Sequence, residues 1–159
     1  MSDRKVKWGV IGAGGIADRR TMPGMMLAKN AELIAVMDVN EKIIGGLKEK
    51  YHAKYAYTNA DELIANPEIE AVYIATPVFC HAEQAVKAAQ AGKHILMEKP
   101  IAMTVEQCRE VIEKVDAAGV LSACGFMMRF GALNMKMKEL MDKGILGQVV
   151  SSKAQFTCW

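Results

Sequence analysis

The segment KVKWGVIGAGGIA, residues 5–17, decides the fold of this chain. An apolar run rich in β-formers enters a cluster of glycines, and a helical pattern begins at Gly14. Gly12, Gly14 and Ala17 form a G-x-G-x-x-A pattern, and the next predicted strand ends at Asp38, 21 residues after Ala17. A glycine turn by itself is weak evidence. A strand, a turn, a helix and an acidic residue at this separation together predict a dinucleotide-binding βαβ unit.

Each residue of the turn has a physical reason in such a unit. Gly12 permits the tight turn, and Gly14 lets the backbone approach a pyrophosphate because it has no side chain. Ala17 keeps the helix close to the strand. The backbone N–H groups of Gly15 and Ile16 are predicted to face the anion at the positive end of the helix dipole.

Asp38 predicts which dinucleotide binds. Its carboxylate can accept hydrogen bonds from both hydroxyls of the adenosine ribose, and it would repel a 2′-phosphate. Residues 39–41 are Val-Asn-Glu and contain no arginine that could receive that phosphate. NAD is therefore the expected cofactor, and NADP is the less favoured one. Lys42 keeps NADP open as an alternative, although this lysine also fits a solvated charge on a helix.

Strand-like and helix-like segments alternate up to residue 126, which predicts a parallel sheet covered on both faces. The apolar runs show little strict alternation, as expected for strands buried on both sides. We therefore expect an α/β fold, a Rossmann-type doubly wound parallel sheet of six strands. The first helix is expected to break at Pro23. The predicted strands cover residues 5–12, 32–38, 53–56, 70–77, 94–100 and 120–126, and the predicted helices cover residues 14–20, 41–51, 59–66, 81–92 and 104–119.

The last thirty residues depart from this alternation. Residues 129–147 are predicted to form a helix that ends near Gly144. Residues 148–159 alternate apolar and polar side chains, which indicates a strand with one solvated face. We expect a dinucleotide-binding domain over residues 1–128. Residues 129–159 would then be the first helix and strand of a second, truncated α/β domain.

The bulk composition excludes several classes of protein. Twenty basic and eighteen acidic residues give a net charge of +2, which predicts binding to neither nucleic acid nor membrane surface. No apolar run is long enough to cross a bilayer, and no signal peptide is evident, so a cytoplasmic location is expected. The histidines and cysteines lack the spacing of metal ligands, so no metal site is expected. The cysteines are expected to be reduced thiols: Cys80, Cys108, Cys124 and Cys158.

Two predicted strands end in polar segments, Thr76-Pro77 and Glu98-Lys99-Pro100. Ligands of open parallel sheets bind outside the carboxyl ends of the strands, so both segments are expected to flank the nicotinamide half of the cofactor. A lysine at that place can exchange a proton with a substrate oxygen during hydride transfer. On spacing alone, a surface ion pair between Glu98 and Lys99 at a strand end is the favoured interpretation.

A family resemblance adds to this interpretation. The segments GVIGAGGIA, ATP at 75–77, AGKHILMEKPIA and GFMMRF, with Asp38 and His81, resemble the Gfo/Idh/MocA oxidoreductases. The resemblance implies a six-stranded Rossmann domain and NAD(P)-dependent oxidation or reduction of sugars, inositols or related polyols. It further implies that Lys99 is catalytic, that the Lys99–Pro100 bond is cis, and that Glu98 helps to place Lys99 and the cofactor ribose.

Other roles follow from the resemblance with alternatives left open. His81 matches a position near the cofactor crevice, and a structural hydrogen bond at a helix start explains it as well. Arg129 either touches a ligand or ties two domains together. Members of the family have a larger second domain that completes the substrate pocket. The 159 residues are therefore expected to be inactive alone, and the full-length protein is expected to be a homo-oligomer.

Two other functions compete with a polyol dehydrogenase. Rossmann domains also serve as non-catalytic sensors of NAD, and the resembling family includes NAD-dependent glycosidases. A pure sensor needs no proton donor beside the nicotinamide, so Lys99 favours hydride transfer to or from a sugar or polyol. A second domain would be needed to separate the dehydrogenase from the glycosidase.

Overall fold

The computed structural model of the protein describes residues 4–155. It divides into two compact units, one through Gly125 and one from Phe126 onward. Each unit is described by itself. The assignment of residues 129–159 to the start of a second α/β domain stays a prediction.

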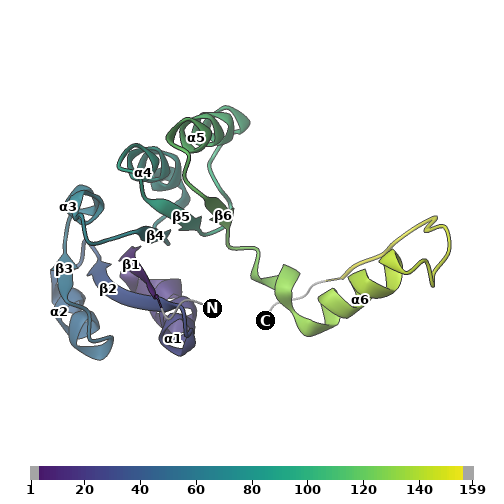
Figure 1. Ribbon diagram of the computed structural model, residues 1–159, viewed down its shortest axis with the longest axis horizontal. Helices are drawn as coiled ribbons and strands as arrows, with labels where there is room; N and C mark the ends of the chain where they lie inside the picture. The colour runs from purple at the N-terminus through teal and green to yellow at the C-terminus, as the bar shows by residue number, and fades with distance from the viewer. Residues whose placement is uncertain (1–3, 156–159) are drawn as a thin grey trace. The chain divides into compact units, whose positions relative to one another are not determined.

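The first unit contains one parallel sheet, which is six-stranded over the described residues and has the order β3-β2-β1-β4-β5-β6 (Figure 1). Every neighbouring pair of strands runs parallel. This strand order is that of a doubly wound Rossmann sheet, so the predicted fold is confirmed. The strands are β1 (Val6–Ile11), β2 (Ala31–Met37), β3 (Tyr55–Tyr57), β4 (Ala71–Ile74), β5 (His94–Met97) and β6 (Ser122–Cys124).

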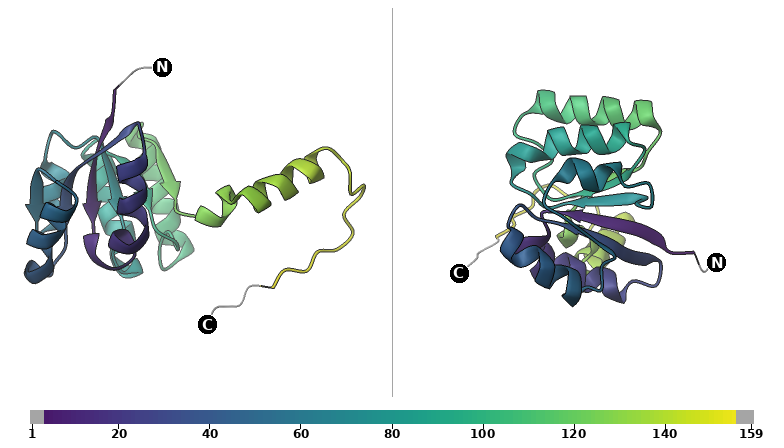
Figure 2. Two further views of the ribbon diagram at one scale, coloured as in Figure 1. Left: turned by 90° about the horizontal axis from the view of Figure 1, so that it is seen from below. Right: turned by 90° about the vertical axis from the view of Figure 1, so that its left-hand side faces the viewer.

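Helices cover the sheet on both faces, and Figure 2 shows the same three layers from other directions. One apolar cluster joins α3, α4 and α5 to the sheet, and a second joins η1 and α2 to the opposite face. All four residues of β4 are buried, because this central strand has helices on both sides. The helical segments are η1 (Ala13–Thr21), α1 (Met22–Leu27), α2 (Glu41–Lys50), α3 (Ala60–Ala65), α4 (Val78–Gln90) and α5 (Val105–Ala118).

Local signals in the sequence set most helix ends. The side chains of Asn40, Asn59 and Thr104 accept backbone N–H groups at the starts of α2, α3 and α5. Gly119 ends α5 in a left-handed conformation with φ of 65°, which a side chain would disfavour. Across residues 4–155, no helix combines the length and the apolar character that crossing a membrane requires.

Two predictions about helix ends in the first unit are wrong. Pro23 lies at the first turn of α1, where η1 changes into an α-helix, and the helical backbone continues past it. The backbone is helical at Thr21 and Met22, so η1 runs directly into α1. The helix predicted to start at His81 instead starts at Val78, immediately after Pro77.

A buried lysine fastens the amino-terminal edge of the sheet. Lys93 precedes β5 and is 7% exposed. Its ammonium donates to the carbonyl oxygens of Asn66 and Ile69, at 2.8 and 2.7 Å. Desolvation lowers the pKa of this lysine. The ammonium thus links the end of α3 and the approach to β4 with the start of β5.

The second unit contains the short helix η2 (Met127–Phe130) and α6 (Ala132–Asp142). Neither helix buries a residue, and α6 carries ion pairs between neighbouring turns, such as Lys138 with Asp142. The observed helix α6 is shorter at both ends than the helix predicted over residues 129–147. Residues 148–155 form no strand, contrary to prediction, because no partner strand pairs with them, and residues 156–159 lie outside the described part of the chain.

Replacement of Lys93 by methionine tests the link at the edge of the sheet. Lys93→Met replaces the lysine with an apolar side chain of similar length and removes both hydrogen bonds of the ammonium. We expect the free energy of unfolding to fall by about 1–3 kcal/mol, because the Ile69 carbonyl loses its ammonium donor. Urea denaturation measures the change. Lys114→Met, on the exposed side of α5, is the control and should stay within about 0.5 kcal/mol of the parent.

Candidate functional site

The turn after β1 fits against the end of β4 because Gly12 has no side chain. Gly12 has φ of 81°, in the left-handed region. A Cβ atom at this position would lie 2.9 Å from the backbone carbonyl of Ala75 and 2.9 Å from the nitrogen of Thr76. The two strand ends could not approach so closely with any other residue. Gly12 thus has the tight-turn role that the sequence indicated.

Gly14 gives space to the Asp38 carboxylate. Its N–H donates to Oδ2 of Asp38 at 2.9 Å, and a Cβ atom on Gly14 would lie 2.9 Å from the same oxygen. The other carboxylate oxygen accepts the N–H of Asn40 at 3.0 Å. Gly15, with φ of 58°, has nothing within 4 Å of the position of a Cβ atom. Gly15 is therefore the glycine that leaves the turn open, whereas Gly14 serves to seat Asp38.

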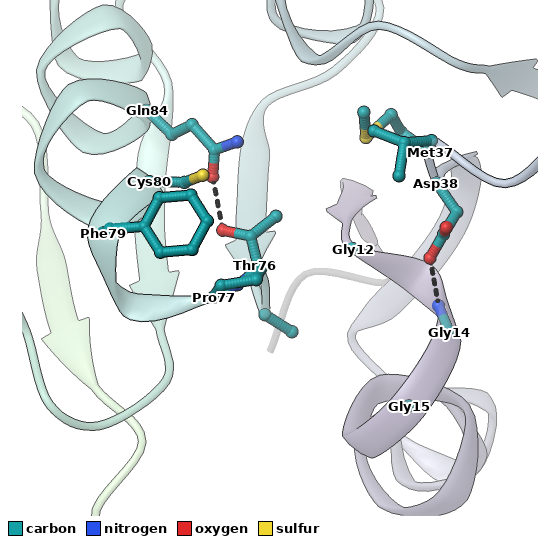
Figure 3. Close-up of a pocket in the computed structure, with 12 residues that line it drawn as sticks. Gly12, Gly14, Gly15, Met37, Asp38, Thr76, Pro77, Phe79, Cys80 and Gln84 are labelled. Atoms are coloured by element: carbon teal, nitrogen blue, oxygen red, sulfur yellow. Dashed lines mark hydrogen bonds between the residues drawn. The ribbon is translucent and has the colours of Figure 1, made fainter.

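These groups border a pocket of about 480 Å³ at the carboxyl ends of β1, β2 and β4 (Figure 3). The glycine turn lies on one side, and the segment that leads into α4 lies on the other. Thr76 donates its hydroxyl to the Gln84 side chain at 2.6 Å, which fixes the second wall. The lining residues are Gly12, Gly14, Gly15, Met37, Asp38, Val39, Ala75, Thr76, Pro77, Phe79, Cys80 and Gln84.

Six of the residues singled out in the sequence thus meet in one pocket: Gly12, Gly14, Gly15, Asp38, Thr76 and Pro77. The others, Ile16, His81, Glu98, Lys99 and Pro100, do not line it. Glu98, Lys99 and Pro100 follow β5 at the same edge of the sheet, and Lys99 and Pro100 are exposed. The Lys99–Pro100 peptide bond is cis, which confirms that prediction.

His81 joins the pocket wall to the turn after β5. The ring is 1% exposed, with Nε2 at 2.8 Å from the Thr76 carbonyl oxygen and Nδ1 at 2.8 Å from that of Pro100. A neutral imidazole carries one N–H and can donate to one of these carbonyls, whereas an imidazolium donates to both. Of the two roles left open for His81, the geometry fits the structural one. His81 spans two strand ends that lie far apart in the sequence.

Several pocket residues were not predicted as site residues: Met37, Val39, Ala75, Phe79, Cys80 and Gln84. Phe79, Cys80 and Gln84 belong to α4 and reach the pocket because this helix starts at Val78. The signal was Pro77, since proline favours the position just before or at a helix start. Partial burial raises the pKa of the Cys80 thiol, so its neutral form is favoured in this wall.

The charges near the glycine turn are few. Arg19 is exposed, and its Nε donates to the carbonyl oxygen of Gly15 at 3.1 Å. Arg20 lines a separate hollow beside β1 and α1. Among residues 4–155, no three side chains of His, Cys, Asp or Glu gather as a metal-binding group would. Cys80, Cys108 and Cys124 are free thiols, and Cys158 lies outside the described residues.

A parallel sheet in this order, with a glycine turn and an acidic residue at its carboxyl edge, defines a dinucleotide-binding Rossmann protein. Residues 6–126 match the family model Gfo/Idh/MocA, described as an oxidoreductase family with an NAD-binding Rossmann fold. The chain belongs to this family, as its motifs suggested.

Relatives in the family include dehydrogenases. The chain is 32% identical over 153 residues to oxidoreductase P35 of Formosa agariphila, covering 96% of this chain and 48% of that protein. It is 32% identical over 140 residues to myo-inositol 2-dehydrogenase of Thermotoga maritima, covering 88% and 42%. Scyllo-inositol dehydrogenase from Lactobacillus casei, solved with NAD(H) and scyllo-inositol, matches with a TM-score of 0.85 and 26% identity over 91% of this chain and 43% of that one. The chain spans about half the length of these relatives.

Removal of the His81 ring nitrogens tests the connection between the two strand ends. His81→Leu fills the buried space with an apolar side chain and removes the hydrogen bonds of the imidazole to the Thr76 and Pro100 carbonyls. We expect the free energy of unfolding to fall by about 1–3 kcal/mol for this reason. Gln90→Leu, at the exposed end of α4, should change it by less than about 0.5 kcal/mol. Equal urea midpoints for the two variants would show that the His81 hydrogen bonds do not contribute to the free energy of unfolding.

Proposed function

We propose that the whole protein transfers a hydride between NAD and a sugar, inositol or related polyol, with Lys99 as the proton donor or acceptor. The observation that carries the proposal is the arrangement at one edge of the sheet. A pocket that suits a dinucleotide is tied through His81 to the turn that presents Lys99. Substrates of this class are named for the inositol dehydrogenases among the relatives.

The residues of the pocket fit the adenosine and pyrophosphate parts of NAD. Asp38 has each carboxylate oxygen held by one backbone N–H and retains lone pairs for two ribose hydroxyls. The open side of Gly15 lets an anion approach the backbone where the helical turns of η1 begin, after the non-helical Gly14 and Gly15. Arg19 adds a positive charge beside the Gly15 carbonyl. Val39 and Phe79 offer apolar surface at the rim, at 79% and 69% exposure.

Lys99 has the chemistry for proton transfer. Bound NAD would supply the hydride acceptor, and oxidation of an alcohol also releases one proton from the hydroxyl oxygen. A lysine side chain within reach of that oxygen can take the proton as a base or return it during reduction. Glu98 accepts the Lys99 backbone N–H at 3.3 Å and so helps to hold the residue at the strand end. Orientation of the polyol against Lys99 is the further requirement for rate.

We also propose a preference for NAD over NADP. Asp38 is the charged group among the described residues that line the pocket, and no lysine or arginine lies with it. A 2′-phosphate on the adenosine ribose would meet the carboxylate with like charge and without a cationic partner. Lys42 lies at the start of α2 and is exposed outside the lining of the pocket.

The preference is tested by titration calorimetry with both cofactors on the parent chain and on Asp38→Asn. The amide keeps the shape and one acceptor oxygen but removes the negative charge. We expect the ratio of the NADP and NAD dissociation constants to fall by about tenfold or more in the variant. Asp61→Asn, on the exposed surface of α3, should leave the ratio unchanged. Equal or tighter binding of NADP by the parent chain would contradict the proposal.

The role of Lys99 is tested in the whole protein with Lys99→Met, which keeps the stem and removes the ammonium. NADH absorbance is followed with inositols, sugars and sugar alcohols at millimolar concentration. We expect kcat to fall by about 10²–10⁴-fold on the best substrate, while the dissociation constant of NAD changes by less than about threefold. Lys114→Met is the control. A variant with undiminished kcat would remove Lys99 from the reaction, and NAD binding without turnover on any substrate would favour an NAD sensor.

A further inference from the structure

A tyrosine in the central strand reaches the carboxylate that precedes Lys99. Tyr73 of β4 is 1% exposed, and its backbone pairs with Val10 of β1 on one side and Leu96 of β5 on the other. Its ring belongs to the apolar cluster beneath η1 and α2. The hydroxyl donates to Oε1 of Glu98 at 2.7 Å. A core side chain with fixed backbone and fixed ring thus ends on a residue of the proposed site.

The hydroxyl of Tyr73 has a second partner, so its orientation is set. Thr21, at the end of η1, donates its own hydroxyl to the Tyr73 oxygen at 2.9 Å. With that lone pair occupied, the Tyr73 proton points to Glu98. Burial raises the pKa of the Tyr73 hydroxyl, which keeps the donor proton in place. The chain of donors therefore runs in one direction, from Thr21 through Tyr73 to Glu98.

Glu98 connects this fixed hydroxyl to Lys99, the next residue in the turn after β5. Its Oε1 atom is held by Tyr73, and its Oε2 atom accepts the backbone N–H of Lys99 at 3.3 Å. A Cβ atom on Gly125 would lie 3.4 Å from Oε1, so a larger residue at position 125 would touch the carboxylate. Lys99 itself is exposed. The Glu98 carboxylate is therefore a fixed point to which the exposed turn is attached.

We infer that Tyr73 is a positioning residue, which orders the Lys99 backbone by fixing the Glu98 carboxylate. This inference rests on the proposed role of Lys99 in proton transfer. A side chain held by packing and by a second hydrogen bond keeps its partner within the narrow range that proton transfer needs. Tyr73 lies behind Glu98 and contributes order to the turn, with no contact to the reacting groups.

The test compares two tyrosine variants. Tyr73→Phe keeps the buried ring and removes the bond to Glu98. Tyr51→Phe is the matched control, since Tyr51 is 4% exposed in the same apolar cluster and donates to the Asp18 carboxylate at 2.7 Å. Relaxation of the ¹⁵N-labelled backbone amides of the chain gives the order parameter of Lys99. We expect it to fall from about 0.85 to below about 0.6 in Tyr73→Phe and to stay unchanged in Tyr51→Phe.

Variants of Glu98 test the same connection from its other end. Glu98→Ala removes the acceptor, and we expect the same loss of order at Lys99. Glu98→Gln offers one acceptor oxygen to two donors, so it breaks either the bond from Tyr73 or the bond from the Lys99 N–H, and we expect order at Lys99 to fall in this variant too. The double variant Tyr73→Phe/Glu98→Ala should show no further loss, because both changes break one connection. An additive loss, or a rigid Lys99 in Tyr73→Phe, would overturn the inference. Where Tyr73→Phe does not fold, Glu98→Ala still tests the inference, because a rigid Lys99 in that variant would overturn it.

Kinetics separate this inference from the proposed function. In the whole protein, we expect Tyr73→Phe to lower kcat by about tenfold or more with KM and the NAD dissociation constant within about threefold, because the turn and not the pocket is disturbed. Tyr51→Phe should keep kcat within about twofold. A parent protein that turns over no polyol defeats the proposed function, while the Lys99 order parameters still decide the role of Tyr73. An active parent with equal kcat in both variants defeats the inference alone.

Discussion

The close contact between the glycine turn and the end of β4 is the constraint on which the site depends. Only a residue without a Cβ atom, in a left-handed conformation, lets the backbone at Gly12 lie against Ala75 and Thr76. That contact brings the ends of β1 and β4 together. Gly14 then lies where its N–H meets Asp38, and Thr76 and Pro77 form the opposite wall of the pocket.

The carboxyl edge of the sheet is organised by side chains that bind backbone groups across long sequence separations. Asp38 holds the glycine turn, and His81 holds the carbonyls of Thr76 and Pro100. The Glu98 carboxylate accepts hydrogen bonds from the Tyr73 hydroxyl in the core and from the N–H of Lys99 in the turn. The bonds of Asp38, His81 and Tyr73 cross between elements, so the pocket and the Lys99 turn are parts of one connected edge. Such second contacts are what hold functional groups in a fixed geometry.

The motifs of the sequence predicted most of the fold and about half of the residues that line the pocket. The alternation of apolar strands and helices predicted a doubly wound sheet, because strands buried on both faces read as continuous apolar runs. A helix predicted from His81 leaves out the turn that starts after Pro77, and that turn is what brings Phe79, Cys80 and Gln84 to the pocket. The strand predicted over residues 148–159 rested on alternation alone, and alternation cannot supply the partner strand that pairing requires.

The sequence by itself determined the glycine turn, the acidic residue after β2, the helix caps and, through its family resemblance, the cis bond before Pro100. These are local features, in which neighbouring residues fix the backbone of one another. The tertiary structure decided that Gly14 seats Asp38, that His81 spans two strand ends, and that Tyr73 reaches Glu98. Each of these pairings depends on the side of the sheet to which a side chain points and on the order of the strands. The spacing of the residues predicts neither the side of the sheet nor the strand order, because partners such as Tyr73 and Glu98 meet only after the parallel strands have paired.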